Sequence, residues 1–214
     1  NNIMFGFFKK KKKVAAIDKV YRTSREKVDA IGFDVEAFLA AGEDVFIFYY
    51  FEETKKWVEY LLNAKQIEFT DLGKANRATK ATLFPAKDIN PSSRLIDSLR
   101  RYSDANSSQF LFANRYPLYT KEVNILEDLS TLHDEVIQPC FYLSLDDPLM
   151  EVFGSDRIKV IMDRMGYKEG ELIQHAMVTK SISIAQQNLE GNVDHENRAD
   201  SQEEWFERNL PGGA

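Results

Sequence analysis

Few residues in this sequence of 214 could carry out catalysis, and they do not group into a known motif. Gly73-Lys74 is the only Gly-Lys pair, and it lacks the upstream glycine and the following Ser or Thr of a phosphate-binding loop. The sequence has no G-x-S-x-G elbow and no H-E-x-x-H motif, and a lone cysteine cannot form a paired-thiolate zinc site. We therefore predict no catalytic residue, no metal site and no cofactor, and we do not expect the chain alone to be an enzyme.

The remaining reactive side chains have structural explanations. His133 lies beside two acidic residues on a predicted helix, where we expect a solvated residue rather than a general base. Cys140 stands in the apolar run 140–143, which indicates a buried structural thiol. Capping and the helix dipole account for two carboxylate pairs at predicted helix starts, Glu52-Glu53 and Asp146-Asp147.

Composition and charge narrow the class of protein. A hydrophobic fraction of 43% with 29% charged residues predicts one well-buried domain with tails. The net charge of −6 argues against a nucleic-acid partner, because such binders usually carry a basic surplus. No apolar run approaches the roughly 20 residues that span a bilayer, and the start of the sequence does not look like a secretory signal, so we expect a cytoplasmic protein.

The first residues combine an aromatic cluster with a basic run. This composition is typical of a peripheral anchor for anionic lipid, although a solvated, disordered terminus is the simpler alternative. The candidate membrane-contact residues are Phe5, Phe7, Phe8, Lys9, Lys10, Lys11, Lys12 and Lys13. Membrane association therefore remains open.

The other end of the chain is acidic and ends in one predicted helix. The string Ser201-Gln202-Glu203-Glu204 is a capping box that would start a short helix before Pro211. Its apolar side chains are candidates for docking onto a partner protein, namely Trp205, Phe206 and Leu210. The alternative is that this segment folds back onto its own domain.

Strand and helix patterns alternate through the middle of the chain. Helix is predicted from Val14 through Tyr21 toward Ala30, and Asp34 is expected to cap a second short helix that ends at Gly42. Five short runs rich in β-branched or aromatic residues predict strands, over 45–50, 67–70, 81–84, 109–112 and 140–145. Amphipathic helices are expected between them, and further helices after residue 147. This alternation indicates an α/β protein with a doubly wound, mostly parallel sheet of about five strands and a C-terminal helical appendage.

A resemblance to a known family rests on strings in the last third of the chain. The sequence 141–150 (FYLSLDDPLM), then 153–158 and 162–166, looks like the end of the second motor domain of the preprotein translocase ATPase SecA. The string 170–182 is similar to the entry into that family's long scaffold helix, and 20–23 and 62–65 echo the start of the same domain. The resemblance covers roughly residues 18 to 187.

This resemblance implies a RecA-like sheet and a division of the chain into four parts. These are a basic and aromatic tail (1–17), a degenerate second motor domain (18–153), a helical appendage (154–190) and an acidic tail (191–214). The family's Gly-Arg-Gly element is absent where Ala81-Thr82 continues through 83–88. No arginine stands between Arg115 and Arg157, where the family keeps the arginines that reach the nucleotide phosphates, and its first motor domain has no counterpart in this sequence.

Three hypotheses follow from these retained and missing segments. In the first, the chain is a non-catalytic protein-interaction module of bacterial preprotein translocation, with SecA, the translocon, the ribosome or a preprotein as partner. In the second, it completes an ATP site in trans with a phosphate-loop partner. In the third, it is a relic domain redeployed outside secretion, because a shared fold does not transfer function.

Overall fold

The structure, a computed structural model, describes residues 14, 16–74, 80–90, 94–104, 107–132, 136–152, 154–168, 170–173 and 176–210. The N-terminal run of phenylalanines and lysines lies outside these residues. Two of the histidines, His133 and His175, also lie outside them. No helix in the described ranges is long and apolar enough to cross a membrane.

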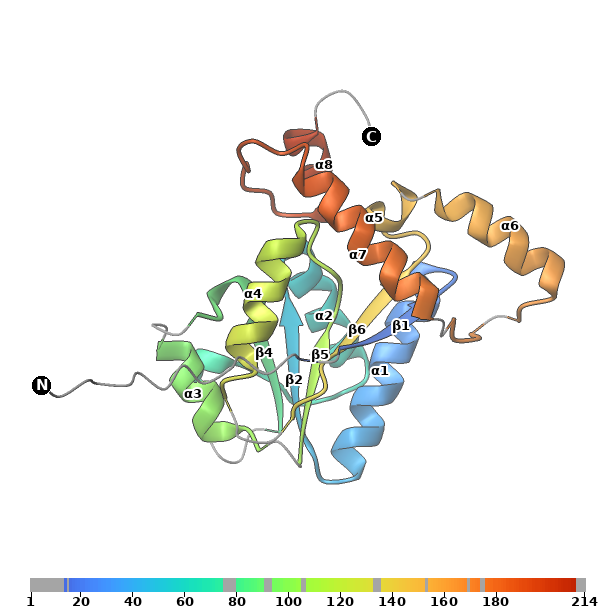
Figure 1. Ribbon diagram of the computed structural model, residues 1–214. Coiled ribbons are helices and arrows are strands. Elements are labelled where there is room, and N and C mark those ends of the chain that lie inside the picture. The colour runs from blue at the N-terminus through green and yellow to red at the C-terminus, as the bar shows by residue number, and fades with distance from the viewer. Residues whose placement is uncertain are drawn as a thin grey trace, which may run out of the picture.

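A sheet of six strands forms the centre of the molecule (Figure 1), and every pair of neighbouring strands is parallel. Its order is β1-β6-β5-β2-β4-β3. The strands are β1 (Ile17–Tyr21), β2 (Asp44–Tyr49), β3 (Thr70–Asp71), β4 (Ala81–Pro85), β5 (Ser108–Phe112) and β6 (Cys140–Ser144). The two central strands β2 and β5 are almost wholly buried, as expected for a parallel sheet that is covered on both faces.

Helices cover both faces of this sheet. The helices are α1 (Ser24–Ala40), α2 (Glu52–Ala64), α3 (Arg94–Tyr102), α4 (Tyr119–Leu129), α5 (Pro148–Glu151), α6 (Ser155–Met165), α7 (Ala176–Glu190) and α8 (Gln202–Asn209), with the short 3-10 turns η1 (Leu72–Lys74) and η2 (Ala86–Asp88). One apolar cluster joins α1 and α2 to one face, and a larger cluster joins α3, α4, α7 and α8 to the other. The predicted α/β, doubly wound parallel sheet is therefore confirmed.

The first strand and helix correct the sequence-based assignment. Residues 17–21 form an edge strand and not a helix, so the sheet has six strands where we expected about five. Helix α1 then runs without a break through Asp34, which caps nothing. Its carboxylate instead accepts hydrogen bonds from Lys19 of β1 and Tyr142 of β6, at 2.6 and 2.5 Å. The true start of α1 is a capping box in which Thr23 and Glu26 bond each other's backbone N–H.

The C-terminal half of the chain packs onto the same core as the sheet. Met162 of α6, Ile182 and Leu189 of α7, and Trp205 of α8 all belong to the larger buried cluster. Figure 1 shows α5, α7 and α8 gathered at the end of the molecule toward which the strands point, while α6 projects to one side. The segments described as an appendage and an acidic tail therefore lie over the carboxyl edge of the sheet.

Candidate functional site

The carboxyl ends of the strands are where an open α/β sheet usually binds its ligands. The chain leaves β2 toward α2 on one face and leaves β5 toward α4 on the other, so the loops part between these two neighbouring strands. A cavity of about 310 Å³ lies at this edge. Its lining comes from the starts of α1, α2 and α8 and from the loops after β5 and β6: Ser24, Lys27, Val28, Glu53, Thr54, Trp57, Asn114, Asp146, Asp147, Pro148, Gln202 and Glu203.

A buried ion pair between Lys27 and Asp147 forms one wall of this cavity. The Nζ atom of Lys27 lies 2.5 Å from Oδ1 of Asp147, and both side chains are only 8% exposed. Asp147 also accepts hydrogen bonds from the backbone N–H of Ser144 (2.9 Å) and from its hydroxyl (2.8 Å). The hydroxyl oxygens of Ser24 and Ser144 lie 3.1 Å apart. Both serines therefore belong to a network that ties β6 to the start of α1.

The serines at this edge are engaged within the network. A serine nucleophile needs a neighbouring base, and the carboxylate beside Ser144 is itself paired with the ammonium group of Lys27. No group of three or more His, Cys, Asp or Glu side chains that could hold a metal occurs in the part of the chain that the structure describes. The network ties the end of β6 and the start of α5 to the start of α1.

The neighbouring Asp146 is held in its charged form. Partial burial alone would raise the pKa of this carboxyl, but hydrogen bonds from Lys159 (2.7 Å) and from the backbone N–H of Ser24 (2.9 Å) outweigh burial and lower it. The sequence-based account of Asp146-Asp147 as a helix start was incomplete. Asp147 does occupy the N-cap position of α5, but its side chain makes no capping hydrogen bond and pairs with Lys27 instead.

Arg115 lies near this edge, in the loop after β5. It is the only buried arginine among the residues that the structure describes. Its guanidinium donates to Asp18 of β1 (Nε at 3.0 Å, Nη2 at 2.5 Å) and to Glu122 of α4, and it stacks on the ring of Phe141 at 4.0 Å from the ring centroid. Burial alone would lower the pKa of Arg115, but Glu122 and Asp18 outweigh burial and raise it. This guanidinium is therefore charged, and each of its three nitrogens donates to a carboxylate of the same chain.

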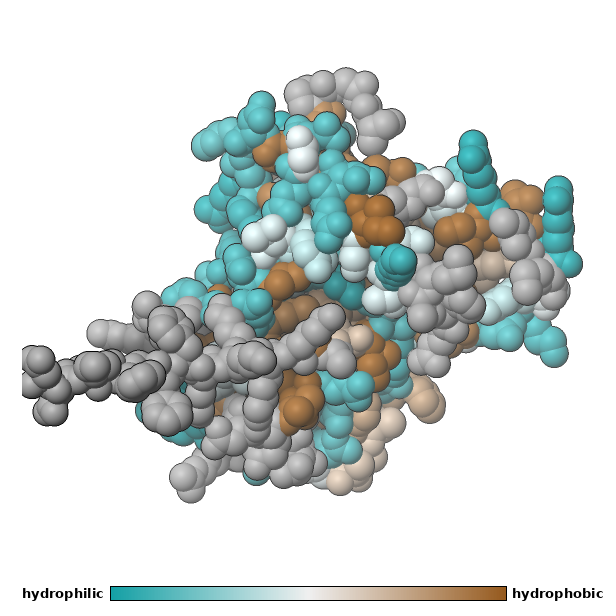
Figure 2. Space-filling model, in the orientation of Figure 1, coloured by the Kyte–Doolittle hydropathy of each residue, from teal (hydrophilic) through white to brown (hydrophobic). Residues whose placement is uncertain are grey.

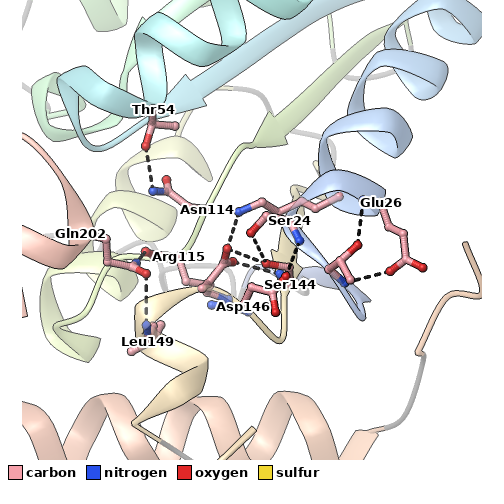
Figure 3. A network of polar contacts seen from close by, with 12 residues as sticks. Ser24, Glu26, Thr54, Asn114, Arg115, Ser144, Asp146, Leu149 and Gln202 are labelled. Atoms are coloured by element: carbon pink, nitrogen blue, oxygen red, sulfur yellow. Dashed lines mark hydrogen bonds and ion pairs between the residues drawn. The ribbon is translucent and has the colours of Figure 1, made fainter. Parts of the chain in front are cut away.

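The C-terminal segment is fastened to the same edge. Gln202 accepts a hydrogen bond from the N–H of Leu149 (3.1 Å) and donates one to the carbonyl oxygen of Arg115 (2.9 Å), as Figure 3 shows. Trp205 is only 1% exposed, and its indole N–H donates to Glu196 at 2.7 Å. Phe206 and Leu210 are half-buried against the same cluster. The structure thus has the arrangement that we left open as an alternative, in which the tail folds back onto its own domain.

A second cavity, of about 420 Å³, is lined in part by the same C-terminal segment. Aromatic side chains and three cations line it, together with polar residues of the C-terminal segment: Tyr50, Phe51, Lys87, Tyr116, Lys121, Glu196, Asn197, Arg198, Ala199 and Trp205. Lys87 comes from η2, in the part of the chain where the Gly-Arg-Gly element of the resembled family is absent.

Sequence reasoning missed several of these residues for different reasons. The capping box of Thr23 and Glu26 had a local signal, the S/T-x-x-E spacing, that could have located the start of α1. The pairing of Lys27 with Asp147 has no such signal, because the two residues are 120 positions apart. Asp147 nonetheless falls in the string 141–150, which resembles the SecA family.

The class of protein is defined by its doubly wound, all-parallel α/β sheet. Sheets of this class usually bind their ligands at the carboxyl ends of the strands. Comparison with known proteins then shows partial homology to SecA. The protein translocase subunit SecA of Chlorobaculum tepidum is 29% identical over 182 residues, and SecA 1 of Chlorobium chlorochromatii is 31% identical over 188 residues. Each match covers 81% of this chain.

The homology is partial because the chain spans only 18% of the length of these two relatives. A stretch of 52 residues, 24% of this chain, is 64% identical to the SecA of Flavobacterium psychrophilum. No protein-family model matches the chain. Among solved structures, the C-terminal part of the Fun30 ATPase domain is similar at a TM-score of 0.43 and 12% identity, over 77% of this chain and 54% of that one, which is too distant to support an argument.

Proposed function

We propose that this chain is a non-catalytic protein-interaction module, related to SecA and accessory to bacterial preprotein translocation. The observation that carries the proposal is the state of Arg115. An arginine that stabilises a transferring phosphoryl group must present its guanidinium to the nucleotide. Arg115 instead donates to Asp18 and Glu122 inside the domain, with its side chain only 6% exposed.

The position of the C-terminal segment supports the same reading. Gln202 bridges the loop after β5 to the start of α5, and the backbone N–H of Glu53 at the start of α2 donates to the carbonyl oxygen of Asp200 at 3.0 Å. The C-terminal segment thus covers part of the carboxyl edge and helps to line the 310 Å³ cavity that stays there. A second motor lobe that works with a nucleotide would use this edge for its ligand, and here the chain itself occupies part of it.

The surface offered to a partner is the pair of helices α6 and α7. Val160 of α6 is 49% exposed and Ile184 of α7 is 46% exposed, and Figure 2 shows hydrophobic patches among hydrophilic ones on the projecting part of the molecule. Partners would be SecA, the translocon, the ribosome or a preprotein, in the cytoplasm, with contact to an anionic membrane through the N-terminal lysines.

A pull-down with point variants tests this proposal. The tagged full chain is incubated with extract of the native cell, and SecA, translocon, ribosomal proteins and preproteins are quantified. We expect at least one of them to be enriched with the wild type, and the enrichment to be lost when Val160→Asp is combined with Ile184→Asp. Val136→Asp is the matched control, because Val136 is also exposed (69%) but lies in the loop before β6. Enrichment of none of these partners would count against the proposal.

The second candidate, a nucleotide site completed in trans, is favoured by one observation. Lys87, Lys121 and Arg198 line the 420 Å³ cavity, although Lys121 pairs with Glu196 there. The partly buried ring of Tyr116 lines the same cavity and could stack on a base. Calorimetry with ATP and ADP, with and without the native phosphate-loop motor, decides between the two. Heat that appears with the wild type and disappears with Lys87→Ala would support the nucleotide site, and heat in neither experiment would end that idea. The third reading, redeployment outside secretion, predicts partners from another process in the pull-down.

A further inference from the structure

The 310 Å³ cavity at the carboxyl edge has a strongly acidic lining. Four carboxylates line it (Glu53, Asp146, Asp147 and Glu203) against one cation, Lys27. Asp147 is neutralised by Lys27, and Asp146 is bonded to Lys159. Within the described part of the chain, no hydrogen bond or ion pair engages the side chain of Glu53 or Glu203. Two carboxylates from different helices, α2 and α8, therefore face the same cavity without a counter-charge.

A buried hydrogen-bond acceptor in the cavity wall also has no partner. Asn114 is only 6% exposed, and its Nδ2 atom donates to the hydroxyl of Thr54 at 3.0 Å. Its Oδ1 atom has no hydrogen-bond donor. Buried polar side-chain atoms are nearly always satisfied, so an unsatisfied one in a cavity wall points to a ligand that donates a hydrogen bond. Figure 3 shows Asn114 between Thr54 and the network around Ser24.

The ring of Trp57 adds a surface suited to a cation. Trp57 is half-buried at the cavity, and the Nζ atom of Lys27 already lies 5.7 Å from its ring centroid. The face of an indole ring attracts ammonium and guanidinium groups. A volume of about 310 Å³ is at the small end of the range of about 300–1,000 Å³ for ligand sites, so it suits one side chain or one small molecule.

We propose that this cavity binds a cationic group, a guanidinium or an ammonium, between the carboxylates of Glu53 and Glu203, with its N–H donating to Oδ1 of Asn114. The group belongs either to a small free amine or to an arginine or lysine side chain of another protein. The site is separate from the exposed α6 and α7 residues on which the proposed function is tested. Either proposal can therefore fail without the other.

Titration of the ¹⁵N-labelled full chain tests this site. The probes are agmatine, cadaverine and a short blocked peptide with one central arginine, and the readout is the side-chain amide signal of Asn114 and the indole N–H signal of Trp57. We expect both signals to shift saturably. A peptide with citrulline in place of arginine has nearly the same shape without the charge, and should cause no saturable shift. Tighter binding of agmatine would indicate a free amine as the natural ligand, and tighter binding of the peptide a protein side chain.

Charge variants provide the decisive comparison. Glu53→Gln combined with Glu203→Gln should weaken binding about fivefold or more, because two ion pairs are lost. Glu207→Gln is the matched control, since Glu207 is an exposed carboxylate on the same helix α8 that does not line the cavity, and it should bind as the wild type does. Equal affinity of the double variant, equal binding of the citrulline peptide, or no saturable shift of Asn114 and Trp57 would each overturn the proposal.

Discussion

Arg115 illustrates how far a single residue can be understood from the sequence and where the structure is needed. The residues next to Arg115 in the sequence do not indicate that its side chain is buried. One of its carboxylate partners is distant in the chain, and the other lies on the next helix. Asp18 is 97 positions away and Glu122 is seven. The sequence shows that no arginine follows Arg115 before residue 157. Only the structure shows that Arg115 itself binds two carboxylates of the same chain.

We predict that Arg115→Ala destabilises the fold strongly. Removing one partner from a buried ion pair leaves uncompensated charge, at a cost of about 3–5 kcal/mol. Arg115→Lys should recover only part of this, because one ammonium cannot donate to Asp18 and Glu122 with the geometry of the guanidinium. Urea unfolding measures the free energies. Arg208→Ala is the control, because that arginine pairs with Glu204 at the surface and its loss should cost less than about 1 kcal/mol. Similar losses for both variants would contradict the role assigned to Arg115.

Cys140 offers a second test at the same scale. The sequence predicted a buried structural thiol, and the structure confirms its burial, with 9% exposed surface. Burial raises the pKa of this thiol to about 11, so little thiolate is present at neutral pH. We expect a thiol reagent such as DTNB to modify the native protein very slowly at pH 8 and the urea-unfolded protein within seconds to minutes. Equally fast reaction of the native protein would show that the strand β6 opens readily.

At the scale of elements, local sequence patterns predicted those strands and helices whose formation depends mainly on neighbouring residues. Strands β2, β4, β5 and β6 and helix α2 form where apolar runs and amphipathic spacing indicated them, within a residue or two at most ends. Strand β1 was missed because two of its five residues, Asp18 and Lys19, are charged, a composition unusual for a strand. Their charges are satisfied by Arg115 and Asp34 from other elements, which no local pattern can reveal.

Helix α8 shows a different limit of sequence reasoning. Its capping serine was predicted and is confirmed, since Ser201 accepts a hydrogen bond from the N–H of Glu204. The pattern could not decide which surface would bury Trp205, because an amphipathic helix looks the same whether it docks onto a partner or onto its own domain. The structure buries this indole against Tyr116, with ring centroids 6.5 Å apart.

We therefore predict that α8 contributes to the stability of the isolated chain. Trp205→Ala should cost about 3–5 kcal/mol, as for other large-to-small changes in a core, and lower the melting temperature by roughly 10 °C. Deleting residues 201–214 should have at least this effect. Differential scanning calorimetry measures both. Glu207→Ala on the same helix is the control and should change the melting temperature by no more than about a degree or two. A chain that keeps its melting temperature without residues 201–214 would show that the tail does not belong to the core.

At the scale of the whole molecule, the fold class could be predicted from the sequence, and the order of the strands in the sheet could not. Alternation of strand and helix predicted a doubly wound parallel sheet, and the resemblance to SecA agrees with the homology found. The pairing of β1 with β6, the pairing of β2 with β5 and the fastening of the C-terminal segment to the carboxyl edge depend on contacts between residues more than 50 positions apart. Such contacts leave no periodic trace in a single sequence.

The charge distribution is also a property of the whole chain, with a basic run at one end and an acidic segment at the other. We predict that the full chain sediments with vesicles rich in phosphatidylserine at low salt, because each lysine near an anionic surface contributes about 1 kcal/mol. Replacing the five lysines 9–13 with glutamine should abolish this binding. The matched control replaces five exposed lysines elsewhere and makes the same change in net charge: Lys56, Lys74, Lys87, Lys168 and Lys180. If both variants lose binding equally, net charge and not the N-terminal run governs contact with the membrane.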